Sequence, residues 1–182
     1  MQRVEDGAWD PRHRYKDDFY FVTTASITTN SRLWRLRFKD VEHPEQGGTI
    51  EILVNNGDHR MFDNMTIDRC GRVLMQEDVG NNARLGKIWL YDIKSAQLIE
   101  VAAHNPKFFQ LGGAMFLTQD EESSGIIDAG RILGKGWFLL DTQAHFANGL
   151  VLVEGGQLMA MYVDPSVGLG CVQDDDDDEG DD

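Results

Sequence analysis

Acidic and amide side chains gather at three places in the sequence where apolar segments begin or end. The members of these groups are Glu5, Asp6, Asp63, Asn64, Glu77, Asp78, Glu121, Glu122 and Asp141. Crowded carboxylates repel one another unless a cation neutralises them. Their hard oxygen atoms suit Ca²⁺, Mg²⁺ or Mn²⁺ better than zinc. If the fold brings the groups together, the sequence therefore predicts a metal site of the calcium type.

Six of these side chains are the predicted metal ligands. They are Glu5, Asp63, Asn64, Glu77, Glu121 and Glu122. Solvated strand ends and turn caps use the same residue types, so that interpretation stays open for each of them. Asp10, Asp68 and Asp128 stand where apolar segments end, and we expect them to form turns.

Arg3 is the predicted contact for a substrate. It lies two residues before Glu5, so on a strand both side chains would point to the same face. A guanidinium beside a metal-binding carboxylate suits a phosphate or carboxylate group. A simple ion pair between Arg3 and Glu5 explains the spacing equally well. His145 follows a later strand and would reach the same region, although a lone histidine in a loop is more often structural.

The acidic groups recur because the chain repeats a pattern of short apolar strands separated by turns. The expected strands are 5–10, 19–24, 33–38, 49–54, 62–68, 72–78, 87–93, 97–103, 121–128, 136–141 and 157–163. Aliphatic and aromatic residues dominate these segments, and several alternate with polar residues, as strands do. No stretch has the spacing and caps of an amphipathic helix.

Repeats of about four short strands in about 40 to 60 residues are typical of a β-propeller. We therefore predict an all-β fold of about three four-stranded blades, a partial or half propeller. The expected blades are residues 1–57, 58–110 and 111–165, and an acidic disordered tail follows at 166–182. A two-sheet sandwich also has many short strands, but it gives no reason for the acidic starts to recur. Closed propellers have four to eight blades, so this chain is not expected to close a ring alone.

The charge and the cysteines narrow the choice of partners. The formal net charge is −14, of which the segment 174–182 supplies eight charges. Nucleic acids and anionic membranes bind basic surfaces, so neither is expected as a partner.

The apolar runs are too short to cross a membrane, and no signal peptide is expected before Arg3. Two cysteines are too few for a disulfide framework or a cysteine zinc site, and we expect Cys70 to be an isolated thiol in a turn.

The segments that carry the acidic groups resemble the C-terminal part of the PhoX-type alkaline phosphatases. The matching strings are Arg3–Pro11, Asp63–Asp68, Gln76–Asp78, Glu121–Asp128 and Val153–Leu158. The resemblance implies a six-bladed propeller that hydrolyses phosphomonoesters at an iron and calcium cluster in its channel. It also implies that Arg3 binds phosphate, that Glu5 binds metal, and that the protein is periplasmic or extracellular.

Members of that family are much longer than this chain. Their upstream region supplies a cysteine and another glutamate to the metal cluster. The resemblance therefore implies a phosphatase portion that is completed by an N-terminal propeller fragment or by a second copy in a homodimer, since two sets of three blades make six. The second hypothesis is a non-catalytic calcium-binding module that assembles through its exposed sheet edges.

Overall fold

The computed structural model describes residues 2–146, 154–169 and 171, and these residues form three antiparallel sheets. Sheet 1 contains β1 (Arg3–Trp9), β2 (Asp18–Thr24), β3 (Arg32–Phe38) and β4 (Gly48–Val54). Sheet 2 contains β5 (Phe62–Ile67), β6 (Arg72–Glu77), β7 (Lys87–Asp92) and β8 (Gln97–Ala103). Sheet 3 contains β9 (Glu121–Asp128), β10 (Trp137–Ala144) and β11 (Gly155–Tyr162). The prediction of an all-β fold is confirmed.

In the residues described, helical structure is limited to short turns between the strands. These turns are the 3₁₀ segments η1 (His13–Tyr15) and η2 (Pro44–Gln46) and the helices α1 (Pro106–Phe109) and α2 (Gly130–Leu133). None of the helices in the described part of the chain is long and apolar enough to cross a membrane. Most of the expected acidic tail at 166–182 lies outside the described residues.

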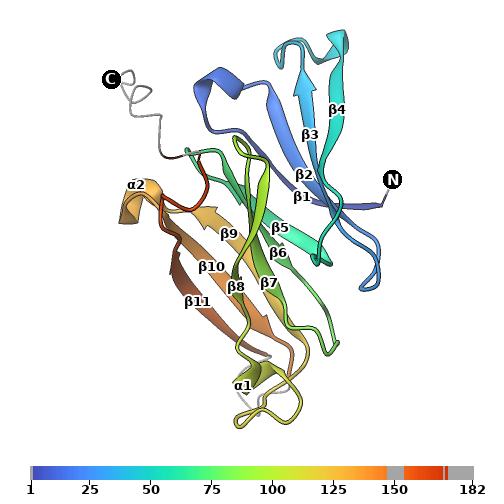
Figure 1. The fold of residues 1–182 in the computed structure, drawn as a ribbon, viewed down its shortest axis with the longest axis vertical. Helices are drawn as coiled ribbons and strands as arrows, with labels where there is room; N and C mark the ends of the chain where they lie inside the picture. The colour runs from blue at the N-terminus through green and yellow to red at the C-terminus, as the bar shows by residue number, and fades with distance from the viewer. Residues whose placement is uncertain (1, 147–153, 170, 172–182) are drawn as a thin grey trace.

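The three sheets stack in chain order, with sheet 2 in the middle (Figure 1). One core fills the space between sheets 1 and 2 and includes Tyr20, Val22, Leu33, Phe62, Val73, Met75 and Trp89. A second core fills the space between sheets 2 and 3 and includes Leu74, Ile88, Leu90, Ile126, Phe138 and Leu140. Because side chains alternate along a strand, β6 supplies residues to both cores. All six of its residues are therefore buried.

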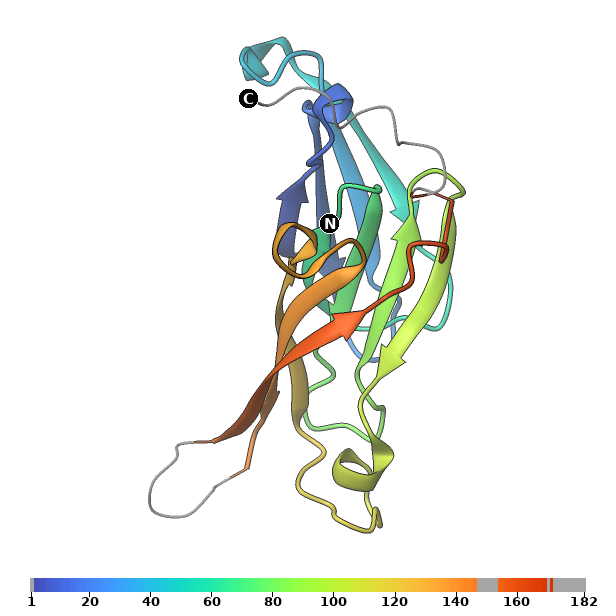
Figure 2. The same cartoon turned by 90° about the vertical axis from the view of Figure 1, so that its left-hand side faces the viewer.

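The array of sheets is elongated and open. Both views place the hairpin of β3 and β4 at one end of the long axis and α1 at the other (Figures 1 and 2). In each sheet the strands run in sequence order from one edge to the other, and no sheet closes on itself within the residues described. Sheet 3 has three strands among these residues, which agrees with the lack of an obvious fourth strand in the third repeat.

The first strands of the sheets, β1, β5 and β9, lie next to one another. Asp6 joins the first two, because its Oδ2 atom accepts a hydrogen bond of 3.0 Å from the Met65 backbone N–H. Asp78, directly after β6, pairs with Glu122 of β9 in an isolated antiparallel bridge. The starts of the three strands are thereby held together.

A bulge interrupts each first strand at the same point of its register. Two residues of the first strand oppose one residue of the second strand at Glu5–Asp6, at Asp63–Asn64 and at Ser124–Gly125. Such bulges bend a strand and turn side chains in a new direction. The repeat that the sequence indicates is therefore also a repeat of backbone geometry. Glu121 and Glu122 stand before the third bulge, so they are not the structural counterparts of Asp63 and Asn64.

An aspartate caps the turn after each first strand: Asp10 and Asp68 directly follow β1 and β5, and Asp128 is the last residue of β9. The side chains of Asp10, Asp68 and Asp128 accept backbone hydrogen bonds from the residues two positions later, at 3.0, 2.9 and 2.8 Å. This is the local bond by which Asp favours turns. The expectation that these three residues form turns is confirmed.

Candidate functional site

Asp63, on the bulge of β5, is the centre of the acidic group. Burial raises the pKa of Asp63, the negative charges of Glu5, Asp78, Glu122 and Asp6 add to the shift, and together they bring the pKa to about 6. These neighbours come from β1, from the end of β6 and from β9. The fold therefore brings side chains from all three repeats within electrostatic reach of one carboxylate.

Asp78 extends the group toward sheet 3. Burial raises its pKa, and the charges of Glu122 and Asp120 raise it too, while a hydrogen bond from the Gly80 backbone N–H lowers it. The net direction is upward. Asp78 and Asp63 are thus both carboxylates whose negative charge is insufficiently compensated by the protein.

Asn64 is the other residue of the same bulge, and its side chain carries a neutral oxygen atom. Its Oδ1 atom is buried and has no hydrogen-bond partner among the residues that the structure describes. A buried amide oxygen without a partner costs free energy, because it has left water without replacing the hydrogen bond it made there. A bound cation would supply the missing interaction.

Arg3 and Glu5 form the ion pair that their spacing allows. Arg3 Nε lies 2.7 Å from Glu5 Oε1, and the Arg3 side chain is 65% exposed. The hydrogen bond and the charge of Glu5 raise the pKa of Arg3, and Asp63 and Asp78 contribute in the same direction. Arg3 therefore presents a solvent-accessible guanidinium at the edge of the acidic group.

Glu77 does not belong to this group. Its side chain is fully buried, and its Oε1 atom accepts hydrogen bonds from Arg60 N, Arg84 Nη2 and Trp89 Nε1. Its Oε2 atom accepts another from Arg84 Nε at 2.8 Å. Both carboxylate oxygens are thus occupied by protein donors. The next residue, Asp78, points to the other side of the strand and joins the acidic group in its place.

Glu121 and Glu122 are neighbours in sequence but have different surroundings. Glu121 is fully buried and accepts a hydrogen bond of 3.0 Å from Gly86 N through Oε1. Its Oε2 atom has no partner within the described part of the chain. Burial raises its pKa to about 7, against a lowering by that hydrogen bond. Glu122 faces the acidic group, as its effect on Asp63 shows. Glu121 also lies within electrostatic reach of the group, because the charge of Asp78 raises its pKa.

His145 closes the sheet 3 side of the group. Its Nε2 atom lies 3.3 Å from Glu122 Oε2, and its Nδ1 atom lies 2.8 Å from Glu154 Oε2. Burial lowers the pKa of His145, but the hydrogen bonds to Glu154 and Glu122 outweigh it, so the net shift is upward. A protonated His145 would compete with a cation for Glu122.

The carboxylates around Asp63 are close enough for their charges to interact, but their oxygen atoms do not form a closed coordination shell for a cation. Within the described residues, the one group of three or more Asp, Glu, His or Cys side chains with all ligand atoms inside 4.8 Å is Asp68, Cys70 and Cys171. Calcium needs six to eight oxygen atoms at about 2.3–2.6 Å. Side-chain rotation and water molecules would have to complete a site around Asp63.

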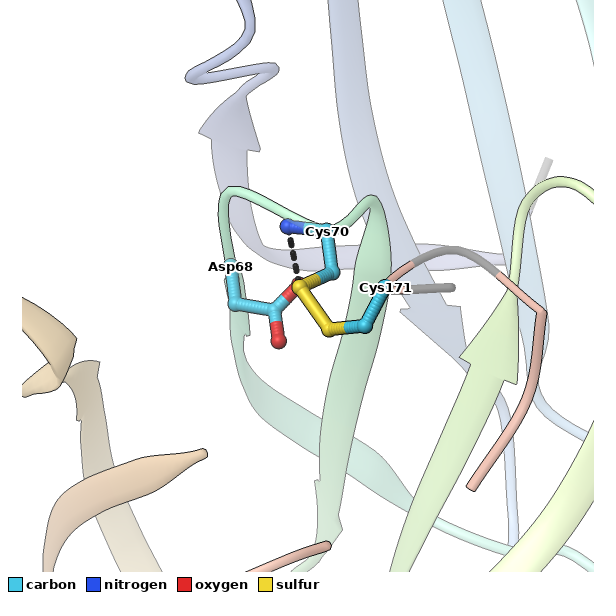
Figure 3. A group of neighbouring side chains, drawn as sticks. All are labelled: Asp68, Cys70 and Cys171. Atoms are coloured by element: carbon cyan, nitrogen blue, oxygen red, sulfur yellow. Dashed lines mark hydrogen bonds between the residues drawn. A yellow bond between two sulfur atoms is a disulfide. The ribbon is translucent and has the colours of Figure 1, made fainter. Parts of the chain in front are cut away.

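The group of Asp68, Cys70 and Cys171 is a cross-linked turn (Figure 3). The two cysteines form a disulfide across 101 residues of sequence, so the expectation of an isolated Cys70 thiol is wrong. The Asp68 carboxylate accepts hydrogen bonds from Cys70 N, Arg72 N and Arg72 Nε. Neither the sulfur atoms nor the carboxylate are therefore free to bind a metal.

A separate cavity of about 720 Å³ lies between sheets 2 and 3, near α1. Its lining is mainly apolar and includes Ile88, Leu140 and Met159. The polar pair in its wall is His104 and Ser123, with Nε2 and Oγ 2.9 Å apart, and burial lowers the pKa of His104 to about 4. Sequence reasoning did not identify this pair, because no motif or spacing links the two residues.

No model of a known protein family matches this chain, and no curated protein matches it either, so the likeness to PhoX-type phosphatases rests on the acidic strings themselves.

Proposed function

We propose that the chain binds a hard divalent cation, of the calcium class, at the starts of β1, β5 and β9. The proposed ligands are Glu5, Asp63, Asn64, Asp78 and Glu122. The observation that carries the proposal is that the junctions Asp6–Met65 and Asp78–Glu122 bring carboxylates of all three repeats together around Asp63, and burial and these charges raise its pKa. A cation would remove this repulsion.

The chemistry of the donor set fits calcium. All five side chains offer oxygen atoms, and no described residue donates a hydrogen bond to the buried Asn64 Oδ1. Hard oxygen donors of mixed charge are the usual ligands of Ca²⁺. The family resemblance also implies iron. The proposed ligand atoms are all oxygen atoms, which calcium accepts equally well, and the sulfur atoms of both cysteines are joined in the disulfide. We therefore restrict the proposal to a calcium-class ion.

We further propose that this site belongs to a phosphomonoesterase centre. A bound cation would polarise a phosphoryl oxygen or lower the pKa of a bound water. Arg3 supports this proposal, since its exposed guanidinium stands beside the acidic group and suits bidentate binding of phosphate. Glu5 would orient Arg3 through the 2.7 Å contact.

The proposed fold around this centre is three consecutive blades of a β-propeller. Three features support it: the adjacent first strands, the bulge at one point in each register, and the aspartate that caps the turn after each first strand. In a propeller the first strands line the central channel, which is where the acidic group would lie. The disulfide supports a periplasmic or extracellular location, because such bonds persist in oxidising compartments.

The second candidate function is a calcium-binding module without catalysis. The ion pair between Arg3 and Glu5 favours it, since an arginine neutralised by its neighbour is less available to a substrate. Both candidates need the same cation site. They differ in whether the calcium-loaded protein hydrolyses a phosphomonoester such as p-nitrophenyl phosphate.

Thermal unfolding with calcium or with a chelator tests the shared claim. A ligand that binds only the folded state stabilises it by about 2.7 kcal/mol at 100 times its dissociation constant. For a chain of this size that is about 5–10 °C in melting temperature. Asp63→Asn keeps the shape of the side chain, and it should raise the melting temperature without calcium and remove most of the calcium effect.

Glu42→Ala is the matched control, because Glu42 is an exposed acidic residue on a distant loop. It should leave the calcium effect unchanged. Equal melting temperatures with calcium and with chelator would reject the cation site and leave the acidic side chains as solvated strand ends.

A further inference from the structure

Sheet 1 has a large apolar face that points away from sheet 2. The side chains on it include Trp9, Phe19, Phe21, Trp34, Ile50 and Ile52. The rings of Trp9, Phe19, Phe21 and Trp34 contact one another in a row. Trp9 is nevertheless 48% exposed and Ile50 is 51% exposed. Contiguous exposed apolar surface of this kind marks an interaction site.

Sheet 3 has a second apolar face, at the other end of the stack. It is formed by Leu139 of β10, Ile127 of β9, and Leu158 and Tyr162 of β11. Ile127 is 57% exposed and Leu158 is 81% exposed. The two end sheets thus both expose apolar faces, and similar faces are buried where the sheets pack on one another inside the array.

The outer face of sheet 1 resembles the face of sheet 2 that is buried against sheet 1. Alignment on the bulges places Trp34 at the position of Trp89, because Trp34 pairs with Phe21 as Trp89 pairs with Met75. The Trp34 indole donates to Thr23 Oγ1 at 2.9 Å, and the Trp89 indole donates to Glu77 Oε1 at 2.9 Å. In sheet 2 this face packs on sheet 1. The outer face of sheet 1 is therefore built to receive a preceding sheet.

The outer face of sheet 3 has the opposite role. Leu139 aligns with Leu74 of sheet 2 and Tyr20 of sheet 1, which face the following sheet in the stack. Leu74 is buried against sheet 3, and Tyr20 is buried against sheet 2. The outer face of sheet 3 is therefore built to receive a following sheet.

A second copy of the chain carries both of the sheet faces that these two outer faces would pack against. Charge favours this pairing as well: Arg32 lies on the outer face of sheet 1, beside Thr23, and Asp141 lies on the outer face of sheet 3, beside Thr142. Thr23 and Thr142 align through the bulges, so these opposite charges would meet at one level. Asp141 Oδ1 has no hydrogen-bond partner among residues 2–146, 154–169 and 171.

We propose that two copies of this chain pack head to tail, the outer face of sheet 1 in each copy against the outer face of sheet 3 in the other, into a closed ring of six sheets. Two identical contacts related by a two-fold axis close the ring and leave neither face exposed. The apolar faces and the repeat alone favour this dimer, so it does not depend on cation binding.

The mass of the particle in solution tests the proposal first. Light scattering at micromolar concentration should give twice the chain mass of 20.5 kDa. A monomer at that concentration would overturn the proposal. Longer assemblies that grow with concentration would also overturn it, because they mean that the head-to-tail contact does not close.

Two variants and their mixture distinguish this dimer from one that uses a single face. Ile50→Arg and Leu158→Glu each place a charge in both contacts of the ring, so each alone should weaken the dimer at least about tenfold. In the mixture, one contact is unmodified and the other opposes Arg and Glu, so the dimer should return. Circular dichroism and a cooperative melt check that both variants fold.

Leu111→Arg is the matched control, since Leu111 is 67% exposed and lies outside the three sheets. It should leave the dimer intact. If Leu158→Glu dimerises normally while Ile50→Arg does not, or if the mixture stays monomeric, the head-to-tail ring is wrong.

Discussion

Asp6 accepts a hydrogen bond from the Met65 backbone N–H across 59 residues of sequence, and this bond fastens β1 to β5. It holds the two bulges together, and it is the reason why Glu5 and Asp63 lie near each other. Asp6 also accepts a bond from its neighbour, the Gly7 N–H, at 2.7 Å. The role of Asp6 is therefore to organise the acidic group rather than to bind an ion.

Asp6→Ala should destabilise the chain by about 1–3 kcal/mol, because it leaves the Met65 N–H without its charged acceptor. Asp6→Asn keeps an acceptor oxygen and should cost less. Urea unfolding of the two variants measures the difference. Equal losses in both variants would mean that the bond to Met65 contributes nothing to the junction of the sheets.

The disulfide should stabilise the fold substantially. In the chain-entropy description, a bridge that closes a loop of about 100 residues raises the free energy of unfolding by up to about 4.7 kcal/mol. Typical values are about 2–4 kcal/mol. Reductant should therefore lower the melting temperature of the natural chain. The double variant Cys70→Ser, Cys171→Ser is the control, and reductant should not change its melting temperature. Full alkylation of both cysteines without reductant would contradict the cross-link.

The raised pKa of Asp63 gives a pH dependence with a definite sign. Without calcium, the folded state binds an extra proton between the ordinary pKa of Asp, about 4, and the folded value of about 6. Stability should therefore fall as the pH rises through that window. Calcium binds the deprotonated form, so its affinity should rise over the same window. In Asp63→Asn both trends should be reduced, and calorimetry at pH 5 and pH 7 measures them.

A Glu77 variant tests whether this carboxylate has a structural role or binds the proposed cation. Its oxygens accept bonds from Arg84 and Trp89 in a buried site, and removal of one partner from a buried ion pair costs about 3–5 kcal/mol. Glu77→Gln should therefore lower stability clearly and leave the affinity for calcium unchanged. A loss of calcium binding in a variant that remains folded would return Glu77 to the ligand set.

The strands were predictable because their residues alternate and their turns carry Gly, Asn and Asp. The expected strand 97–103 matches β8, and 121–128 matches β9. The choice between Glu77 and Asp78 was not predictable in the same way. Adjacent side chains at the end of a strand point to opposite faces, so one of the two faces Asp63, and no signal in composition tells which one.

The cross-link was beyond sequence reasoning for a different reason. Cys70 and Cys171 are 101 residues apart, and only the return of the chain past the turn between β5 and β6 brings them together. The spacing of two cysteines does not determine their distance in the fold. The pair of His104 and Ser123 likewise meets only because sheets 2 and 3 stack.

Isothermal titration of the chelator-treated chain with calcium tests the cation site most directly. The account predicts saturable binding of about one calcium ion per chain at pH 7, and loss of that binding in the double variant Glu5→Gln, Asp63→Asn with the fold intact. Absence of binding heat, with equal melting temperatures in calcium and in chelator, would contradict it.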